Sequence, residues 1–408
     1  KGFLVKPGSL DDAYFYGREN QLRRLYDHLE KGQHTLFAAP RQVGKTALAF
    51  KAIERYSKTS TPIDAAHVDL WRSKSYKEAS TDLINDYMKH NLKIDKFSAK
   101  LGVAIADVIN TIVKSVTAFD LKEHVVRLSK QLESDDGAEC FAQTVEFIEY
   151  LASMRGHRLV LFIDEFQDFT RYSDGVFTEH KREIKENFLK KLRSIIQKSD
   201  TIILFAAGSE ESTMQTLFET EGEAFYKSAK AITVKPIEKE AYSEHFEAVC
   251  NANNLIYSQS VANHFYYLGG GIPYYLSSLG QNYINHLLDD TSSSQKAALL
   301  AIEELYDSEW RYFDEKLTLL NNITYAHNIY VTLEEEHVLS KVAKESNASR
   351  QSVHNIAGNL VNKGFLISKS KRYYPALPLL YLYLKFKTTD EVLEKLSNMM
   401  SNNVIELY

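Results

Sequence analysis

The sequence predicts an α/β fold in which a parallel sheet is followed by a mostly helical C-terminal region. Continuous apolar runs, typical of strands that are covered on both faces, occur at Arg158–Ile163 and Thr201–Ala207. Helical patterns alternate with these runs up to about residue 236, and such alternation predicts a doubly wound parallel sheet. Beyond that point the helical pattern dominates, and Glu334–Phe365 has the pattern of a helix–turn–helix.

Each element of the expected sheet domain has its own local signal. The strands are short apolar runs, in chain order Gln33–Ala38, Asp64–Trp71, Arg158–Ile163, Thr201–Ala207 and a weaker Ala231–Val234. The helices follow the 3.6-residue period of apolar side chains. We expect them at Gln21–Glu30, Lys45–Tyr56, parts of Ser75–Leu132, Gly137–Met154 and Lys181–Gln197.

The composition is that of a soluble globular protein, with 408 residues of which 44% are hydrophobic and 25% are charged. The net charge of −5 argues against a polycation that attracts nucleic acid over its whole surface. Two cysteines are too few for a disulfide framework or a cysteine-rich zinc site, and we expect a cytoplasmic location. No apolar run is long enough for a membrane-spanning helix.

The segment Thr35–Ala49 (TLFAAPRQVGKTALA) has the pattern of a strand, a tight loop and a helix. This is the layout of the phosphate-binding P-loop G-x-x-x-x-G-K-[ST], with Ala39 in place of the first glycine. Backbone N–H groups of the loop and of the first helical turn have no intrahelical partner and can face an anion. We therefore predict nucleotide binding by Pro40, Arg41, Gln42, Val43, Gly44, Lys45, Thr46 and Ala47.

Acidic residues at the end of a later strand complete the expected chemistry. Lys45 supplies a charge for the β- and γ-phosphates, and the Thr46 hydroxyl can ligate Mg²⁺. Asp164, which ends a buried run, can hold the same Mg²⁺. Glu165 can orient or deprotonate the attacking water. The predicted catalytic residues are Lys45 and Glu165, and the predicted metal ligands are Thr46 and Asp164.

Ser209 follows Gly208 at the end of the next apolar run. A small polar side chain there can donate a hydrogen bond to the γ-phosphate or to the attacking water, which makes Ser209 a third candidate catalytic residue. The alternative is that Ser209 caps the helix that begins near Glu210. The sequence leaves both interpretations open.

These motifs together resemble the archaeal-type ATPase family of P-loop proteins, within the AAA+-like and STAND assemblage. The resemblance rests on six segments, and it covers nearly all of the chain. They are Tyr16–Asn20 (YGREN), the loop Pro40–Thr46, Phe162–Gln167 (FIDEFQ), Gly208-Ser209, Gly270–Pro273 (GGIP) and the C-terminal helix–turn–helix, which matches a winged helix.

The resemblance implies roles for residues that local chemistry does not single out. Arg18 would lie near the base and ribose of the nucleotide, whereas the alternative is a surface ion pair. Pro273 would pack near the adenine and report the nucleotide state to a helical lid, whereas the alternative is a proline that only begins a helix. Ser209 would be the polar sensor. No arginine finger stands out among Arg171, Arg182 and Arg193, and without one turnover is expected to be slow.

Three domains are expected: an α/β ATPase domain at 1–236, a helical lid at 237–325 and a winged-helix domain at 326–408. In the last domain we expect helices at Glu336–Glu345 and Arg350–Lys363, then a hairpin wing. Residues 346–389 contain no Asp or Glu but seven Lys or Arg, a bias that favours phosphate contact. Contact with duplex DNA would use Arg350, Lys369, Lys371 and Arg372.

The leading functional hypothesis is an ATPase with bound ATP or ADP and Mg²⁺, acting as a slowly hydrolysing switch on a protein partner or on a second copy of the chain. One alternative is an initiator or regulator that binds duplex DNA through the winged helix. That module can equally pack against the ATPase domain and bind no DNA, since a fold does not fix a function. Another alternative is a nucleotide-binding scaffold that does not hydrolyse ATP. No membrane partner is expected.

Overall fold

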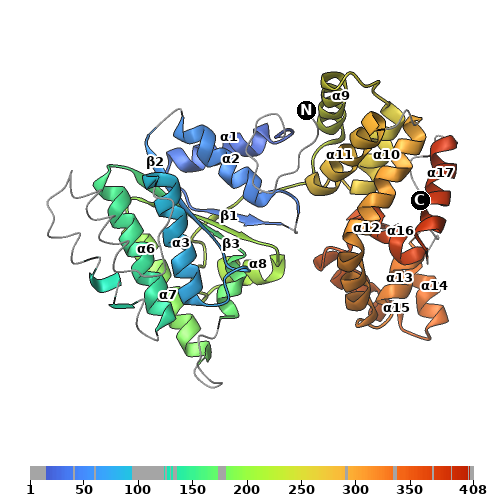
Figure 1. Ribbon diagram of the computed structural model, residues 1–408. Coiled ribbons are helices and arrows are strands. Elements are labelled where there is room, and N and C mark those ends of the chain that lie inside the picture. The colour runs from blue at the N-terminus through green and yellow to red at the C-terminus, as the bar shows by residue number, and fades with distance from the viewer. Residues whose placement is uncertain are drawn as a thin grey trace. The chain divides into compact units, whose positions relative to one another are not determined.

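A computed structural model describes residues 15–39, 42–58, 61–93, 124, 126–128, 130–131, 136–172, 181–289, 293–333, 338–369, 372–386, 388–402 and 404. The chain divides into two compact units. The sheet unit comprises residues 19–41 and 45–234, and the helical unit comprises residues 1–18, 42–44 and 235–408. Figure 1 shows the elements of both units along the chain.

The sheet unit is built on a five-stranded sheet with the strand order β2-β3-β4-β1-β5 (Figure 1). All four strand pairs are parallel, which confirms the predicted sheet. The strands are β1 (Thr35–Ala38), β2 (Ile63–Asp69), β3 (Arg158–Asp164), β4 (Ile202–Gly208) and β5 (Lys230–Ala231).

Two of these strands end earlier than predicted. β2 ends at Asp69 rather than Trp71, because the backbone turns there: the Asp69 carbonyl accepts hydrogen bonds from Arg72 N and Ser73 N. β5 covers only Lys230–Ala231 rather than Ala231–Val234. One more backbone bond joins Ile232 N to the carbonyl of the neighbouring strand before the pairing stops.

Helices cover both faces of the sheet, as Figure 1 shows. The helices α3, α6 and α7 pack side by side on one face, and α1 and α2 lie on the other. On β3, Leu159, Leu161 and Ile163 belong to the core beneath α3 and α6, while Phe162 contacts Phe50 of α2. Coverage on both faces explains why the strand is apolar throughout.

The helices of this unit begin and end close to the predicted positions. Helix α6 has the predicted bounds, and its N-cap Asp136 accepts a hydrogen bond from Glu139 N. The expected helical region Ser75–Leu132 contains α3, while residues 94–123 lie outside the described residues. The helices are α1 (Glu19–Glu30), α2 (Lys45–Ser57), α3 (Tyr76–Leu92), α6 (Gly137–Met154), the 3₁₀ helix η2 (Phe166–Thr170), α7 (Lys181–Lys198) and α8 (Glu211–Glu219).

The helical unit begins with a group of helices around a core rich in buried tyrosines, among them Tyr242, Tyr275 and Tyr283. A sharp turn of Gly270 and Gly271, both with left-handed φ, joins α10 to α11. A Cβ on Gly271 would lie 2.8 Å from the Cβ of Pro236 and 2.9 Å from the carbonyl of Ile237, so this turn needs glycine. The helices are α9 (Lys239–Ala252), α10 (Gln259–Gly269), α11 (Pro273–Asp289), α12 (Ser294–Asn321) and α13 (Ala326–Val331).

The end of the chain has the layout of a winged helix, in which two helices precede a hairpin. Helix α15 contributes Val353 and Leu360 to the core of this unit, and Ala357 is buried as well. The wing consists of two antiparallel strands that pair Lys369 with Arg372. The elements are α14 (Val338–Glu345), α15 (Arg350–Asn362), β6 (Leu366–Lys369), β7 (Arg372–Pro375), α16 (Pro378–Lys385) and α17 (Thr389–Ser401).

The boundary between a lid domain and a winged-helix domain remains a prediction, because both lie within the helical unit. Within the described ranges, no helix combines the length and the apolar character that a membrane span requires.

Candidate active site

The carboxyl ends of the parallel strands form one edge of the sheet, and several predicted site residues lie along it. β1 pairs with β4 so that Ala38 stands opposite Gly208. β2 pairs with β3 so that Asp69 stands opposite Asp164. Since β3 also pairs with β4, four strand ends lie next to one another, which is where parallel sheets bind their ligands.

The described part of the P-loop has a partly left-handed backbone. Gln42 and Gly44 have left-handed φ values of 64° and 88°. The described left-handed residues do not include Ala39, so the alanine that replaces the first glycine carries no conformational cost. Pro40 and Arg41 lie outside the described residues.

The P-loop lysine is buried at the start of α2. Lys45 is 6% exposed, and its Nζ donates a hydrogen bond to the carbonyl of Ala39 at 2.8 Å. Lys45, Thr46 and Ala47 form the first turn of α2, whose N–H groups have no intrahelical partner. The ammonium group is therefore held beside backbone donors, an arrangement that favours an anion.

Thr46 and Asp164 are in direct contact although they come from different elements. The Thr46 hydroxyl donates a hydrogen bond to Asp164 Oδ2 at 2.5 Å, and Asp164 Oδ1 accepts one from Glu165 N at 3.0 Å. Burial raises the pKa of the Asp164 carboxyl, and the charge of Glu165 raises it further, against the lowering effects of Thr46 and Lys45. Hydroxyl and carboxylate oxygens are the ligands that Mg²⁺ takes, so this pair fits that ion.

Asp69 adds a carboxyl group to this edge that the sequence analysis did not single out. Its Oδ1 accepts a hydrogen bond from Trp71 N at 3.1 Å, and its Oδ2 lies 3.2 Å from Arg72 Nε. Burial and the charge of Asp164 both raise the pKa of Asp69. The signal in the sequence was an acidic residue at the end of an apolar run, the same signal that indicated Asp164.

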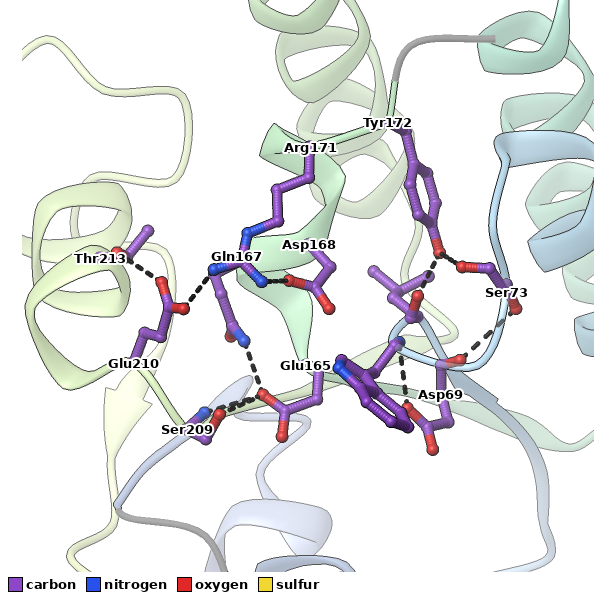
Figure 2. A network of polar contacts seen from close by, with 12 residues as sticks. Asp69, Ser73, Glu165, Gln167, Asp168, Arg171, Tyr172, Ser209, Glu210 and Thr213 are labelled. Carbon is purple, nitrogen blue, oxygen red and sulfur yellow. Dashed lines mark hydrogen bonds and ion pairs between the residues drawn. The ribbon is translucent and has the colours of Figure 1, made fainter. Parts of the chain in front are cut away.

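Glu165 is held by donors from two strand ends, as Figure 2 shows. Its backbone is left-handed, with φ of 51°. Its Oε2 accepts hydrogen bonds from Ser209 N at 3.0 Å, from Ser209 Oγ at 2.6 Å and from Gln167 Nε2 at 2.6 Å. Burial raises the pKa of this carboxyl, but the bonds from Ser209 and Gln167 and the charge of Lys45 outweigh it, so the pKa lies below its ordinary value.

The geometry excludes one of the two interpretations of Ser209, and the role of Ser209 as a catalytic residue remains a prediction. The N-cap residue of α8 is Glu210, so the interpretation of Ser209 as the helix cap is wrong. Its hydroxyl instead donates to Glu165. Gln167 lies within the FIDEFQ segment, and its sequence context alone predicts no role for it.

A second set of contacts joins the region of η2 to the start of α8, next to Gln167 in Figure 2. Arg171 donates to Asp168 Oδ1 at 2.7 Å and also forms an ion pair with Glu210. Glu210 accepts a further bond from Thr213 Oγ1 at 3.1 Å. Arg171, one of the arginine-finger candidates, is thus engaged by carboxylates of its own chain.

The other two candidates for an arginine finger are not singled out either. Arg193 donates to the carbonyl of Ala224. Arg182 belongs to the first turns of α7, whose side chains lie outside the described ones.

Neither a protein-family model nor a curated protein sequence matches the chain. Its structure is similar to the Walker-type ATPase PABY2304 of Pyrococcus abyssi, with a TM-score of 0.64, 15% identity, and coverage of 94% of this chain and 99% of that chain. It is also similar to the ORC2 protein of Aeropyrum pernix, with a TM-score of 0.54, 11% identity, and coverage of 98% and 99%. The chain has a P-loop ATPase fold of the AAA+-like kind. The resemblance inferred from its motifs is confirmed at the level of the fold.

Within the helical unit of this ATPase fold, Arg18 is a buried residue whose side chain connects two backbone segments. It is 3% exposed, its Nη2 donates to the carbonyl of Val43 at 2.7 Å, and its Nη1 donates to the carbonyl of Lys235. Burial lowers the pKa of this guanidinium to about 10. The alternative of a surface ion pair for Arg18 is therefore wrong, and a contact with the nucleotide remains a prediction.

Pro273 begins helix α11, as its alternative interpretation required. A Cβ added to Gly44 would also lie 3.7 Å from Pro273 Cγ, so the proline lies close to this part of the P-loop. The two interpretations of Pro273 are compatible, and its contact with adenine remains a prediction.

The winged helix presents polar side chains on its exposed surface. Arg350 and Asn355 of α15 are exposed, as are Lys369 and Arg372 of the wing. Lys371 lies outside the described residues. The polar face of α15 is therefore available for contact with another molecule.

Proposed function

We propose that this chain binds ATP with Mg²⁺ at the carboxyl edge of its sheet and hydrolyses it slowly to ADP and phosphate. The observation that carries the proposal is the contact of Thr46 Oγ1 with Asp164 Oδ2, 2.5 Å apart. It joins the P-loop helix to the acidic end of β3, and it stands beside Lys45 and Glu165. In a P-loop ATPase these are the groups that phosphoryl transfer needs.

Each residue has a distinct task in the proposed reaction. Lys45 and the N–H groups of the first turn of α2 would bind the β- and γ-phosphates. Thr46 and Asp164 would hold Mg²⁺, which neutralises charge on the phosphates when it is bound. Glu165 would orient a water molecule and accept its proton as the water oxygen bonds to the γ-phosphorus and the bond to ADP breaks. Ser209 would respond to the γ-phosphate.

We infer that the nucleotide state is the signal that this protein passes on. Slow turnover would keep the ATP form populated long enough to act as a switch, and no described arginine is singled out to accelerate it. The output would reach a protein partner, or a second copy of the chain, through the helical unit. Arg18 and Pro273 belong to that unit and would carry the change.

Substitutions at two positions test the proposal. We expect Lys45→Ala to abolish ATP binding measured by calorimetry, and Glu165→Gln to retain binding while phosphate release falls by about 100-fold or more. The matched controls are Lys58→Ala and Glu219→Gln, which replace exposed residues of the same types. Equal phosphate release from the wild type and Glu165→Gln would contradict the assigned base. It would favour the alternative of a scaffold that does not hydrolyse ATP.

Binding of duplex DNA is a second candidate function, because the exposed side chains of α15 and the wing include Arg350 and Arg372 while residues 346–389 contain no acidic residue. Phosphate contacts of this kind weaken steeply with salt. We expect Arg350→Glu with Arg372→Glu to reduce the affinity for a duplex and its salt dependence, measured by fluorescence anisotropy. Lys58→Glu with Lys198→Glu is the control with the same change of charge. Unchanged affinity in the first pair would exclude this function.

A further inference from the structure

We propose that Gln167 is a positioning residue that holds the carboxylate of Glu165 in place, and that Gly208 leaves the space in which the Gln167 amide lies. This inference rests on the proposed ATPase function, in which Glu165 is the base.

The amide of Gln167 and Ser209 at the end of β4 both donate hydrogen bonds to one carboxylate oxygen of Glu165 (Figure 2). Gln167 Nε2 donates to Glu165 Oε2 at 2.6 Å, and Ser209 donates to the same oxygen through both its N–H and its hydroxyl. Hydrogen bonds to an ionised acceptor are stronger than those between neutral groups. Three of them on one atom fix the direction of the Glu165 side chain.

The environment of the Gln167 amide indicates that its main contact is the bond to the carboxylate of Glu165. Gln167 is 1% exposed, and its Oε1 is buried with no hydrogen-bond partner among the described residues. Rotating the amide would point Oε1 at the carboxylate and lose the short bond from Nε2. An unpaired buried acceptor costs free energy that a leucine of similar volume would avoid. A residue that only filled space would therefore have no need of the amide.

Gly208 supplies independent support, because its missing side chain makes room for this arrangement. A Cβ at this position would overlap Gln167 Oε1 and would lie 2.5 Å from Met214 Cγ. Gly208 does not belong to the described residues with a left-handed backbone, so its conformation does not demand glycine. Glycine is required there because a side chain has no room, and the atom nearest to the missing Cβ belongs to Gln167.

The test compares Gln167→Leu with the wild type in steady-state hydrolysis and in equilibrium binding of ATP. We expect kcat to fall by about 10- to 100-fold, the range for losing a hydrogen bond to a charged group. KM and the dissociation constant of ATP should change by less than about twofold, because Gln167 would act on the chemical step alone. Gln215→Leu, at an exposed position of α8, is the matched control.

A second comparison separates positioning from a structural role. In the Glu165→Gln background, Gln167→Leu should cause no further loss of single-turnover phosphate release, because the carboxylate it positions is already gone. Likewise, Gly208→Ala should lower kcat in the wild type and lower it less in a Gln167→Ala background, where the amide no longer obstructs the new methyl group and only the flexible side chain of Met214 has to move. Thermal unfolding of each variant shows whether it is folded.

The outcomes are distinguishable. A further loss in the Glu165→Gln background, or a rise in KM with unchanged kcat, would overturn the positioning role while leaving the ATPase proposal intact. Retained kcat in Gln167→Leu would do the same. Failure of Glu165→Gln itself to slow hydrolysis would instead remove the proposed base.

Discussion

His245 makes the free energy of unfolding depend on pH. The pH range of this effect lies between the pKa values of His245 in the folded and unfolded states. Its imidazole stacks on Tyr16, with ring centroids 3.9 Å apart and an interplanar angle of 13°. Burial disfavours the imidazolium cation and lowers the pKa of His245 from 6.5 to about 4. In the unfolded chain the group titrates near its ordinary value, so between these values the unfolded chain binds more protons than the folded one.

The sign of the effect follows from this difference in bound protons. Stability rises with pH through the window, so it is lost as the pH falls below about 6.5. A pKa of about 4 in the folded state and 6.5 in the unfolded state gives almost no effect at pH 7.5 and about 2 kcal/mol of destabilisation at pH 5. Because the ring is only partly buried, solvent screening makes this an upper value.

The variant His245→Phe keeps an aromatic ring against Tyr16 but cannot bind a proton. Urea unfolding of both proteins at pH 7.5 and pH 5 gives the free energy of unfolding of each. We expect the wild type to lose up to about 2 kcal/mol relative to the variant between these pH values. Burial also lowers the pKa values of three other histidines, His28, His34 and His67. Both proteins contain them, so their contributions to the pH dependence of the free energy of unfolding cancel. A difference that stays constant within about 0.5 kcal/mol would refute the reasoning.

Three other substitutions test the loop, the metal contact and the glycine-rich turn. Ala39→Gly should leave the calorimetric affinity for ATP within about twofold, because the backbone needs no glycine there, and should lower stability by about 0.5–1 kcal/mol. Thr46→Ala should reduce the affinity for ATP with Mg²⁺ but not that for ATP with EDTA, since only the first uses the hydroxyl. Gly271→Ala should destabilise the protein in urea by more than Gly156→Ala. Both have a left-handed φ, but a Cβ meets nothing within 4 Å at Gly156, so equal losses would argue against the clash at Gly271.

The sheet and its helices could be predicted because their signals are local. A strand covered on both faces must be apolar at every position, as β4 is, and a helix packed on one side shows the period of 3.6. Helix α6 carries both that pattern and an N-cap aspartate, and its bounds were predicted to the residue. The end of β2 was missed, since the turn at Asp69 depends on hydrogen bonds to its carbonyl rather than on hydrophobicity.

The sequence also predicted which residues lie along one sheet edge, because parallel strands bring their carboxyl ends together. They are Lys45, Thr46, Asp164 and Glu165. The hydrogen-bond partners of individual side chains could not be predicted in this way. Ser209 and Glu165 are separated by 44 positions, and Arg18 bonds to the carbonyl of Lys235 across 217. No local pattern in the sequence indicates such a contact, so a capping serine and a surface arginine stood as alternatives.

The contact between Ser209 and Glu165 also constrains how the proposed switch can work. A hydroxyl group has one proton, and that of Ser209 is donated to Glu165 Oε2 at 2.6 Å. Ser209 therefore cannot donate to a γ-phosphate and to Glu165 at the same time. If it turns to the phosphate, Glu165 keeps the bonds from Ser209 N and Gln167 Nε2 but loses one of the donors that stabilise its ionised form. Loss of that bond would raise the pKa of Glu165, and the carboxylate would become a stronger base when ATP is in place. Phosphate sensing and activation of the base would thus be one event, with Gln167 keeping the carboxylate aligned throughout.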